Sequence, residues 1–135
     1  MNGQIDWSGL FLSAAGRSPR ASSLIAASIL LASAALYEAI APTTVHWLTG
    51  WFVYPALIYG GVCVLSKRLH DRGRSGWWAA MILVATVAVW PHPDSFLDFV
   101  FTLILIWAAV ELGAMPGELG ANRYGPNPSR PPLAA

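Results

Sequence analysis

The stretch that decides the fold is Lys67-Arg68-Leu69-His70-Asp71-Arg72-Gly73-Arg74-Ser75-Gly76-Trp77-Trp78. It places four cations, a histidine, an aspartate and two glycines between two long apolar segments. Charged side chains are costly inside the hydrocarbon core of a bilayer, so we expect this stretch to be a loop held at a membrane surface. The position of this loop then orients the segments on both sides of it.

The composition indicates an integral membrane protein. Of the 135 residues, 56% are hydrophobic and 11% are charged, whereas a soluble domain is about 25% charged. A chain of this length forms one domain, which we place at residues 1–126 and expect to be followed by a disordered cytoplasmic tail at 127–135. Cys63 is the single cysteine, so no internal disulfide forms.

Four apolar segments approach the length of about 20 residues that a membrane span needs. They are residues 19–41, 47–66, 76–90 and 96–115. Before them, Trp7, Leu10, Phe11 and Ala14 recur at helical spacing, which predicts a short amphipathic helix lying at the membrane interface. The predicted fold is therefore all-α, an integral membrane four-helix bundle with a short N-terminal interfacial helix.

The distribution of basic residues predicts the orientation of the chain. Four spans place all eight lysines and arginines on one side of the membrane, while Asp94 is the only charged residue in the two opposite loops, at 42–46 and 91–95. Loops rich in lysine and arginine stay in the cytoplasm. Both termini are therefore predicted to be cytoplasmic.

Two acidic residues fall inside the predicted spans. Glu38 lies about one turn inside the outer end of the first span, and Glu111 about one turn inside the inner end of the fourth. An ionisable group in a span is a functional hypothesis by default. In the structural interpretation, Glu38 reaches water at the outer surface or hydrogen-bonds to Tyr37 or Tyr54, and Glu111 pairs with an arginine of the central loop.

Three separated motifs resemble those of one known family. They are Gly16, Arg17 and Arg20, then Arg68 to Trp78, then Gly120 to Pro128 with Asn122 and Tyr124 inside it. In these motifs, which occur in the right order, the chain resembles the bacterial membrane family called domain of unknown function 805 along nearly its whole length. Lys67 replaces the first arginine of the family's loop motif, and Pro19 also departs from the pattern. The resemblance implies a small multi-pass protein of the bacterial inner membrane and no agreed activity.

The predicted topology brings the polar residues of these motifs together at the cytoplasmic surface. The candidate site comprises Arg17, Arg20, Arg68, His70, Asp71, Ser75, Asn122, Arg123 and Tyr124. One interpretation is a polar clasp, in which Asp71 accepts hydrogen bonds from Arg17, Arg68 or Arg123 and ties the chain segments together. The other is an anion site for lipid headgroups, because converging arginines bind phosphate well.

The remaining residues do not favour catalysis or metal binding. His46 and His92 are predicted on the opposite side of the membrane from His70, so a zinc site lacks ligands, and no nucleophile with its base is visible. We predict no enzymatic activity, no cofactor and no nucleic-acid partner. The expected role is a structural or accessory subunit of a membrane complex that contacts lipids and binds partner membrane proteins or itself. The alternatives are a small oligomeric transporter or channel, motivated by Glu38 and Glu111, and a membrane sensor that binds lipid headgroups.

Overall fold

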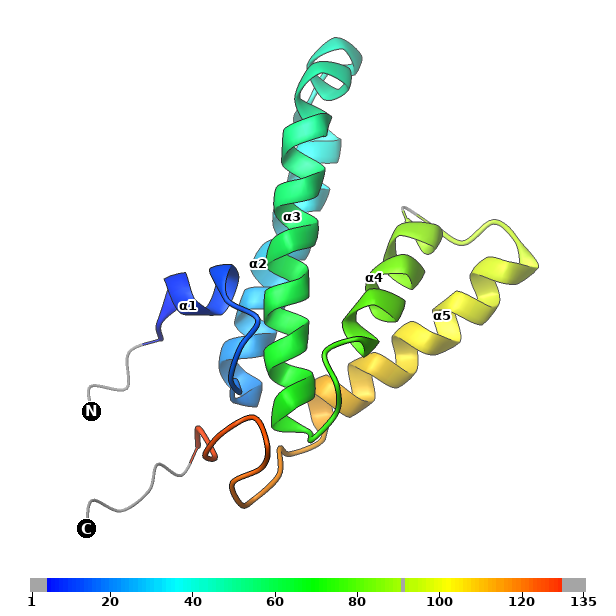
Figure 1. Cartoon of the computed structure of the whole chain (residues 1–135). Helices are drawn as coiled ribbons and strands as arrows, with labels where there is room; N and C mark the ends of the chain where they lie inside the picture. Colours follow the sequence, from blue (N-terminus) through cyan, green and yellow to red (C-terminus); the bar gives the residue numbers. More distant parts are fainter. Residues whose placement is uncertain (1–4, 91, 130–135) are drawn as a thin grey trace.

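The computed structural model describes residues 5–90 and 92–129 of the chain (Figure 1). This part is helical apart from loops and one isolated antiparallel backbone pairing between Asn122 and Gly125. The helices are α1 (Trp7–Leu12), α2 (Arg20–Ile40), α3 (Thr43–Asp71), α4 (Trp78–Val89) and α5 (Phe96–Ala108), which continues as the π-helix η1 (Ala109–Ala114). The predicted all-α class is confirmed for the described residues.

The long helices form two hairpins that meet at one end and diverge toward the other (Figure 1). The first hairpin pairs α2 with α3, and the second pairs α4 with α5. Between the hairpins, α4 packs on α3, and η1 packs on α2. The described helices form an open V, because the hairpins are held together mainly at their shared end. The four-helix bundle that the sequence predicted is therefore not confirmed as such.

Three helices are long and apolar enough to cross a membrane, which indicates a membrane protein. They are α2 with 21 residues, α3 with 29, and α5 continued by η1 with 19. The fourth predicted span, at 76–90, forms the 12-residue helix α4, which is about 18 Å long at 1.5 Å per residue. It is shorter than expected because Gly76 and Trp77 belong to the preceding turn and Trp90 has extended backbone.

The central loop is shorter than the sequence predicted, because α3 continues through Lys67 and ends at Asp71. A glycine turn then stops the helix. The Arg74 amide donates to the Leu69 carbonyl at 2.8 Å, and the Gly73 amide donates to the His70 carbonyl at 3.0 Å. Gly73 has a φ of +73°, the left-handed conformation that glycine adopts at helix C-termini. Residues 72–77 therefore form the loop.

The buried core lies near the shared end of the hairpins. One cluster joins α3, α4 and the α5–η1 helix through Leu69, Ala79, Ile82, Ala108 and Leu112. A second joins α1, α2 and α3 through Leu10, Ala26 and Val64. Two glycines let α3 approach its neighbours: an added Cβ would lie 3.2 Å from Leu30 at Gly60 and 3.1 Å from Leu83 at Gly61. Small residues at helix contacts are typical of helix packing in membranes.

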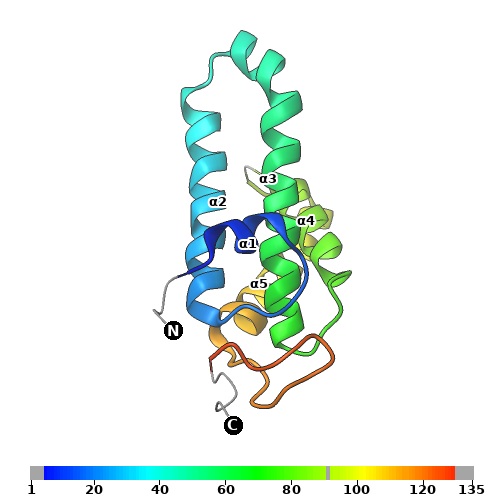
Figure 2. The ribbon, with the colours of Figure 1, turned by 60° about the vertical axis from the view of Figure 1, so that its left-hand side comes forward.

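Helix α1 lies across the base of α2 and α3 (Figure 2). The Asp6 carboxylate accepts a hydrogen bond from the Gly9 amide at 2.9 Å and so begins the helix. This bond, followed by one from the Ser8 hydroxyl, lowers the pKa of Asp6 below its ordinary value. The helix ends at Leu12, so Ala14 lies outside it, contrary to the predicted spacing. The Tyr59 hydroxyl donates to the Leu12 carbonyl at 2.8 Å and ties α1 to α3.

Candidate functional site

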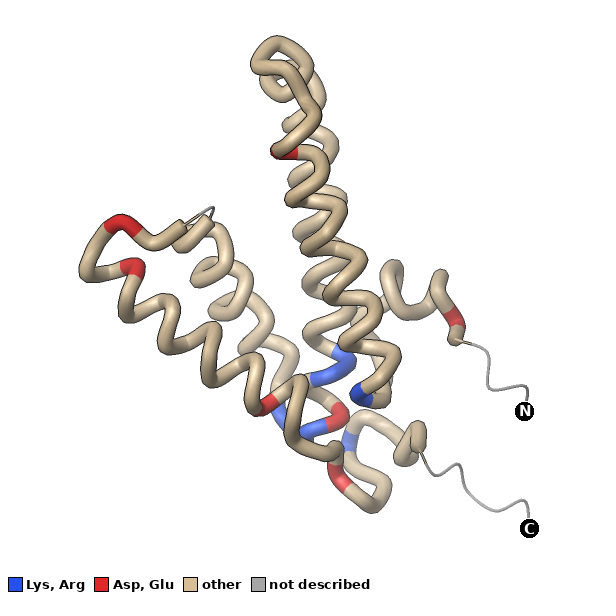
Figure 3. Tube along the Cα trace, turned by 180° about the vertical axis from the view of Figure 1, so that it is seen from behind, with Lys and Arg blue, Asp and Glu red and all other residues tan. Residues whose placement is uncertain are grey.

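The described lysines and arginines gather at the end where the two hairpins meet (Figure 3). Arg130, which the sequence placed on the same side, lies outside the described residues, as does the predicted tail from residue 130 onward. The basic end is assembled from four parts of the chain: the link between α1 and α2, the end of α3 with its loop, η1, and residues 115–125. We call the last of these the clasp segment.

Asp71 lies at the centre of the basic end. Its Oδ1 accepts a hydrogen bond from Arg17 Nε at 3.0 Å and lies 2.9 Å from Arg17 Nη2 in an ion pair. Its Oδ2 accepts a hydrogen bond from Arg68 Nη1. The three side chains are between 1% and 4% exposed. One buried carboxylate thus lies between two buried cations, an arrangement that is stable only when hydrogen bonds satisfy the remaining donors.

Backbone carbonyls of the clasp segment satisfy the remaining donors of Arg17. Its Nη1 donates to the carbonyls of Gly120 at 2.8 Å and Gly125 at 3.3 Å, and its Nη2 donates to that of Glu118 at 2.7 Å. The Glu118 amide in turn donates to the Asp71 carbonyl at 2.8 Å. Arg17 therefore holds the clasp segment against the end of α3.

Arginines also cap the C-terminal end of η1. Arg68 donates from Nε to the Leu112 carbonyl at 2.7 Å and from Nη2 to the Met115 carbonyl at 2.6 Å, and Arg20 donates to the Ala114 carbonyl at 2.9 Å. The last carbonyls of a helix have no partner within it and attract cations. These bonds join the second hairpin to the first.

The other predicted residues of the clasp segment pack around His70. The His70 ring stacks on Tyr124 with centroids 3.8 Å apart, and its Nδ1 lies 2.9 Å from the Gly16 carbonyl. Asn122 donates to the His70 carbonyl at 2.9 Å. Arg123 lies over the outer face of this pair, 4.7 Å from the Tyr124 ring centroid, and is exposed; it is therefore not a partner of Asp71.

Ser75 and Glu111 lie apart from this centre. The Ser75 hydroxyl accepts a hydrogen bond from the Trp77 amide at 3.4 Å, at the start of α4. Glu111 is bound by the central loop, since its Oε1 accepts from Arg72 Nη2 and Arg74 Nε, both at 2.9 Å. Arg72 also donates to the Pro116 carbonyl at 2.6 Å. The single negative charge of Glu111 thus neutralises only one of the two positive charges on Arg72 and Arg74.

The contact between Asp71 and the clasp segment requires a glycine. A Cβ added to Gly117 would overlap the Asp71 carboxylate, whereas one added to Gly120 would meet nothing within 4 Å. A buried carboxylate held by two arginines has no room to move aside. Close packing at Gly117 is therefore part of the site.

Glu38 lies at the opposite end, where α2 turns into α3. Its Oε1 accepts a hydrogen bond from the Tyr54 hydroxyl, as the structural interpretation expected, and lies 3.1 Å from His46 Nε2. The Tyr37 hydroxyl pairs instead with Thr49 Oγ1 at 2.7 Å. Sequence reasoning placed His46 on this side but missed it as a partner, because the contact depends on helix α3 beginning at Thr43 rather than at 47.

Within residues 5–90 and 92–129, no group of three or more histidine, cysteine, aspartate or glutamate side chains is placed to hold a metal ion.

The sequence analysis did not single out Glu118, whose Oε2 accepts a hydrogen bond from the Asn122 side chain at 2.7 Å. A spacing of four residues predicts a contact only within a helix, and this segment is not helical, so the sequence carried no signal for this pair. The carbonyl acceptors of Arg17 and Arg68 carry no signal, because every residue has a carbonyl.

Comparison with known proteins shows one family and two curated relatives. The model of a family described as "Protein of unknown function (DUF805)" matches residues 7–126, from α1 to the clasp segment. "Uncharacterized protein YiiR" of Escherichia coli strain K12 is 39% identical over 87 residues, which are 57% of this chain and 58% of the relative. The protein of the same name in Escherichia coli O157:H7 matches equally. The chain thus spans less than two thirds of these relatives. No solved structure matches significantly.

Proposed function

The chain belongs to the DUF805 family of proteins of unknown function, and we propose that it is a structural or accessory subunit of a membrane complex. In this proposal it crosses the bacterial inner membrane four times with both termini in the cytoplasm. The three long apolar helices support a membrane location. The gathering of the described lysines and arginines at one end supports the orientation, because such residues favour the cytoplasmic side.

The short helix α4 is the fourth crossing in this proposal. Its length of about 18 Å is less than the roughly 30 Å of a bilayer's hydrocarbon core. A short span is accommodated when the bilayer thins locally or flanking residues reach toward the interface. Trp77 and Trp90, which flank α4, are the residue type enriched at both interfaces. A fourth crossing returns the clasp segment to the side of Arg17, where it is bound.

The observation that carries the accessory role is that every side-chain nitrogen of Arg17 and Arg68 is hydrogen-bonded within the fold. Their donors are bound by Asp71 and by backbone carbonyls, so these two arginines serve the fold and are not available to bind phosphate. In this proposal, the bonds that Arg17 and Arg68 make to Asp71, the clasp segment and η1 set the angle between the hairpins. The flanks of both hairpins expose large apolar side chains along their length. A rigid frame with apolar flanks is suited to hold neighbouring membrane helices, and the proposed role involves no enzymatic step.

The transporter alternative receives less support from the two acids. Glu38 lies at the turn end of the first hairpin, bound to His46 and Tyr54, whereas Glu111 lies at the basic end, bound to Arg72 and Arg74. A path for ions or protons needs polar groups at successive depths between two such sites. The sensor alternative rests on Arg20 and Arg123, which are exposed at the basic end.

Reporter fusions test the proposed topology. We expect alkaline phosphatase inserted after Pro42 to be active and green fluorescent protein fused after Asn127 to fluoresce, because the first reporter folds outside the cytoplasm and the second inside it. Insertion of the phosphatase after Gly73, in the central loop, is the matched control and should be inactive. An active phosphatase at Gly73 would reject the proposed orientation.

Isolation of the protein in mild detergent at native expression tests the accessory role. We expect native mass spectrometry to reveal an assembly of fixed stoichiometry with another membrane protein, which re-forms when the two purified components are mixed in nanodiscs. The Asp71→Asn variant should reduce this assembly, and Asp94→Asn, at the opposite end, should not. Protein that is monomeric or self-associated, and that conducts ions in liposomes, would favour the transporter instead.

A further inference from the structure

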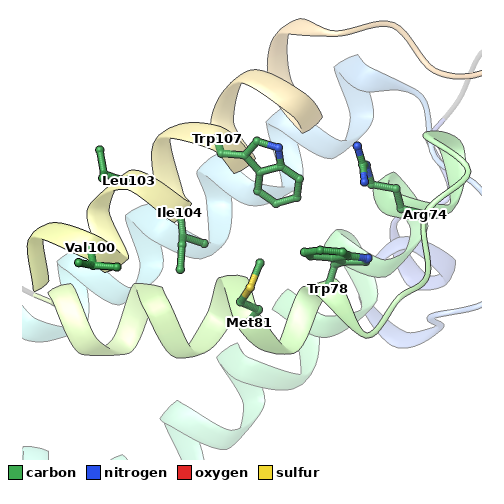
Figure 4. A pocket seen from close by; sticks show the side chains of 7 residues that line it. All are labelled: Arg74, Trp78, Met81, Val100, Leu103, Ile104 and Trp107. Carbon is green, nitrogen blue, oxygen red and sulfur yellow. The ribbon is translucent and has the colours of Figure 1, made fainter. Parts of the chain in front are cut away.

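A groove runs between α4 and α5, and none of its lining residues belongs to the clasp segment (Figure 4). Its volume of about 450 Å³ lies within the roughly 300–1,000 Å³ typical of sites for small molecules. Seven side chains line it: Arg74, Trp78, Met81, Val100, Leu103, Ile104 and Trp107. No acidic side chain is among them, and Arg74 is the only charged one.

The groove is polar at one end and apolar along the rest. Arg74 lies at the basic end beside two tryptophans, with its Cζ 5.6 Å from the ring centroid of Trp107 and 6.0 Å from that of Trp78 (Figure 4). From there the lining continues along Met81 and Ile104 toward the far end of the hairpin. A ligand that fits this lining has an anionic head and an apolar body.

Unlike Arg17 and Arg68, Arg74 is available to bind a ligand. Its side chain is 39% exposed, whereas those of Arg17 and Arg68 are 1% and 2% exposed. Arg74 binds Glu111 through Nε, and its two terminal nitrogens donate to no group in the described part of the chain. Glu111 is shared with Arg72, so two cations face one carboxylate and a positive charge remains.

We propose that this groove binds one anionic phospholipid, with the phosphate on the terminal nitrogens of Arg74 and an acyl chain along the apolar lining. The inference rests on the membrane placement proposed above. Guanidinium groups bind phosphate through paired, charge-assisted hydrogen bonds, and basic pockets between membrane helices on the cytoplasmic side bind anionic headgroups. Trp78 and Trp107 lie at the level where such headgroups meet the apolar core.

Native mass spectrometry of the purified full chain tests the site. Phosphatidylglycerol or phosphatidylcholine with identical acyl chains is added to the detergent. We expect phosphatidylglycerol to remain bound at one copy, and Arg74→Gln to weaken this binding at least tenfold. Arg123→Gln removes an exposed cation from the same end and should leave binding within twofold of the parent protein. Equal retention of phosphatidylcholine, or unchanged binding in Arg74→Gln, would overturn the proposal.

A second variant tests the apolar part of the groove without changing its charge. Met81→Trp fills the middle of the groove, so it should reduce phosphatidylglycerol binding at least tenfold while the helical circular dichroism is kept. Inorganic phosphate at millimolar concentration should not compete, and displacement of the lipid by phosphate would assign a free-anion site instead. Flotation of the protein with liposomes separates the two proposals: a failed lipid site leaves flotation intact, whereas a failed membrane placement abolishes it.

Discussion

Replacing Asp71 with asparagine should destabilise the protein far more than the loss of one charge on its surface. Asparagine keeps the size of the side chain and one carbonyl oxygen, but it removes the negative charge between Arg17 and Arg68. Both arginines are almost completely buried, with side chains 1% and 2% exposed. After the change, two buried cations lie near each other with no counterion. Such uncompensated buried charge is what makes the loss of one partner from a buried ion pair strongly destabilising.

The magnitude follows from the bonds that are lost. The Asp71 carboxylate accepts one hydrogen bond from Arg17 and one from Arg68, and forms an ion pair with each. Removing one partner of a buried ion pair costs about 3–5 kcal/mol. Asparagine still accepts from one arginine, and the bonds from both arginines to backbone carbonyls remain. We therefore expect the free energy of unfolding to fall by about 3 kcal/mol, at the lower end of that range.

Equilibrium unfolding in mixed micelles, with a rising fraction of dodecyl sulfate and detection by circular dichroism, measures this loss. Asp94→Asn is the matched control, because its side chain is 73% exposed at the opposite end and surface changes usually stay within about 0.5 kcal/mol. If the two variants lowered the free energy of unfolding equally, the argument that Asp71 holds the hairpins together through buried charge would be refuted.

Three further variants test other contacts by the same unfolding measurement. Gly117→Ala should cost about 1–3 kcal/mol, because its Cβ would overlap the Asp71 carboxylate, whereas Gly120→Ala should change little; similar effects of both would contradict the close contact. Ser95→Ala removes the side-chain cap of α5 and should cost about 1 kcal/mol; no loss would show that the cap is dispensable. Tyr59→Phe removes the Tyr59 bond to α1, should cost about 1 kcal/mol, and should speed proteolysis within α1. An unchanged cleavage rate would show that packing and the Lys67 bond to the Gly9 carbonyl hold α1 without Tyr59.

The sequence predicted the helices and their polar connections because both follow from local composition. Apolar length alone located α2, α3 and α5, and the motifs around Arg17, Arg68 and Asn122 correctly indicated the family. The predicted end of the second span was wrong for a local reason that competes with apolarity. The polar residues Lys67 to Asp71 stay helical because the glycine turn that stops α3 comes only at Gly73.

The open shape of the fold was not predictable from the apolar pattern. Segments of similar apolarity are compatible with either a closed bundle or two divergent hairpins, because lipid covers an exposed apolar flank as well as another helix does. The choice depends on the contacts at the basic end, where Arg20 and Arg68 bind the carbonyls of η1. Those acceptors belong to the backbone and leave no mark in the sequence.

By itself, the sequence determined the class of the protein, its family and the set of residues that gather at one end, since apolar length and charge placement act along the chain. Only the tertiary structure decided which arginines are occupied and which is available. Arg17 is saturated because the clasp segment, more than 100 residues away in the chain, lies against it, whereas Arg74 lies beside a groove with its terminal nitrogens accessible. A hydrogen bond depends on distance in space, and the folded chain alone brings those distant segments within reach.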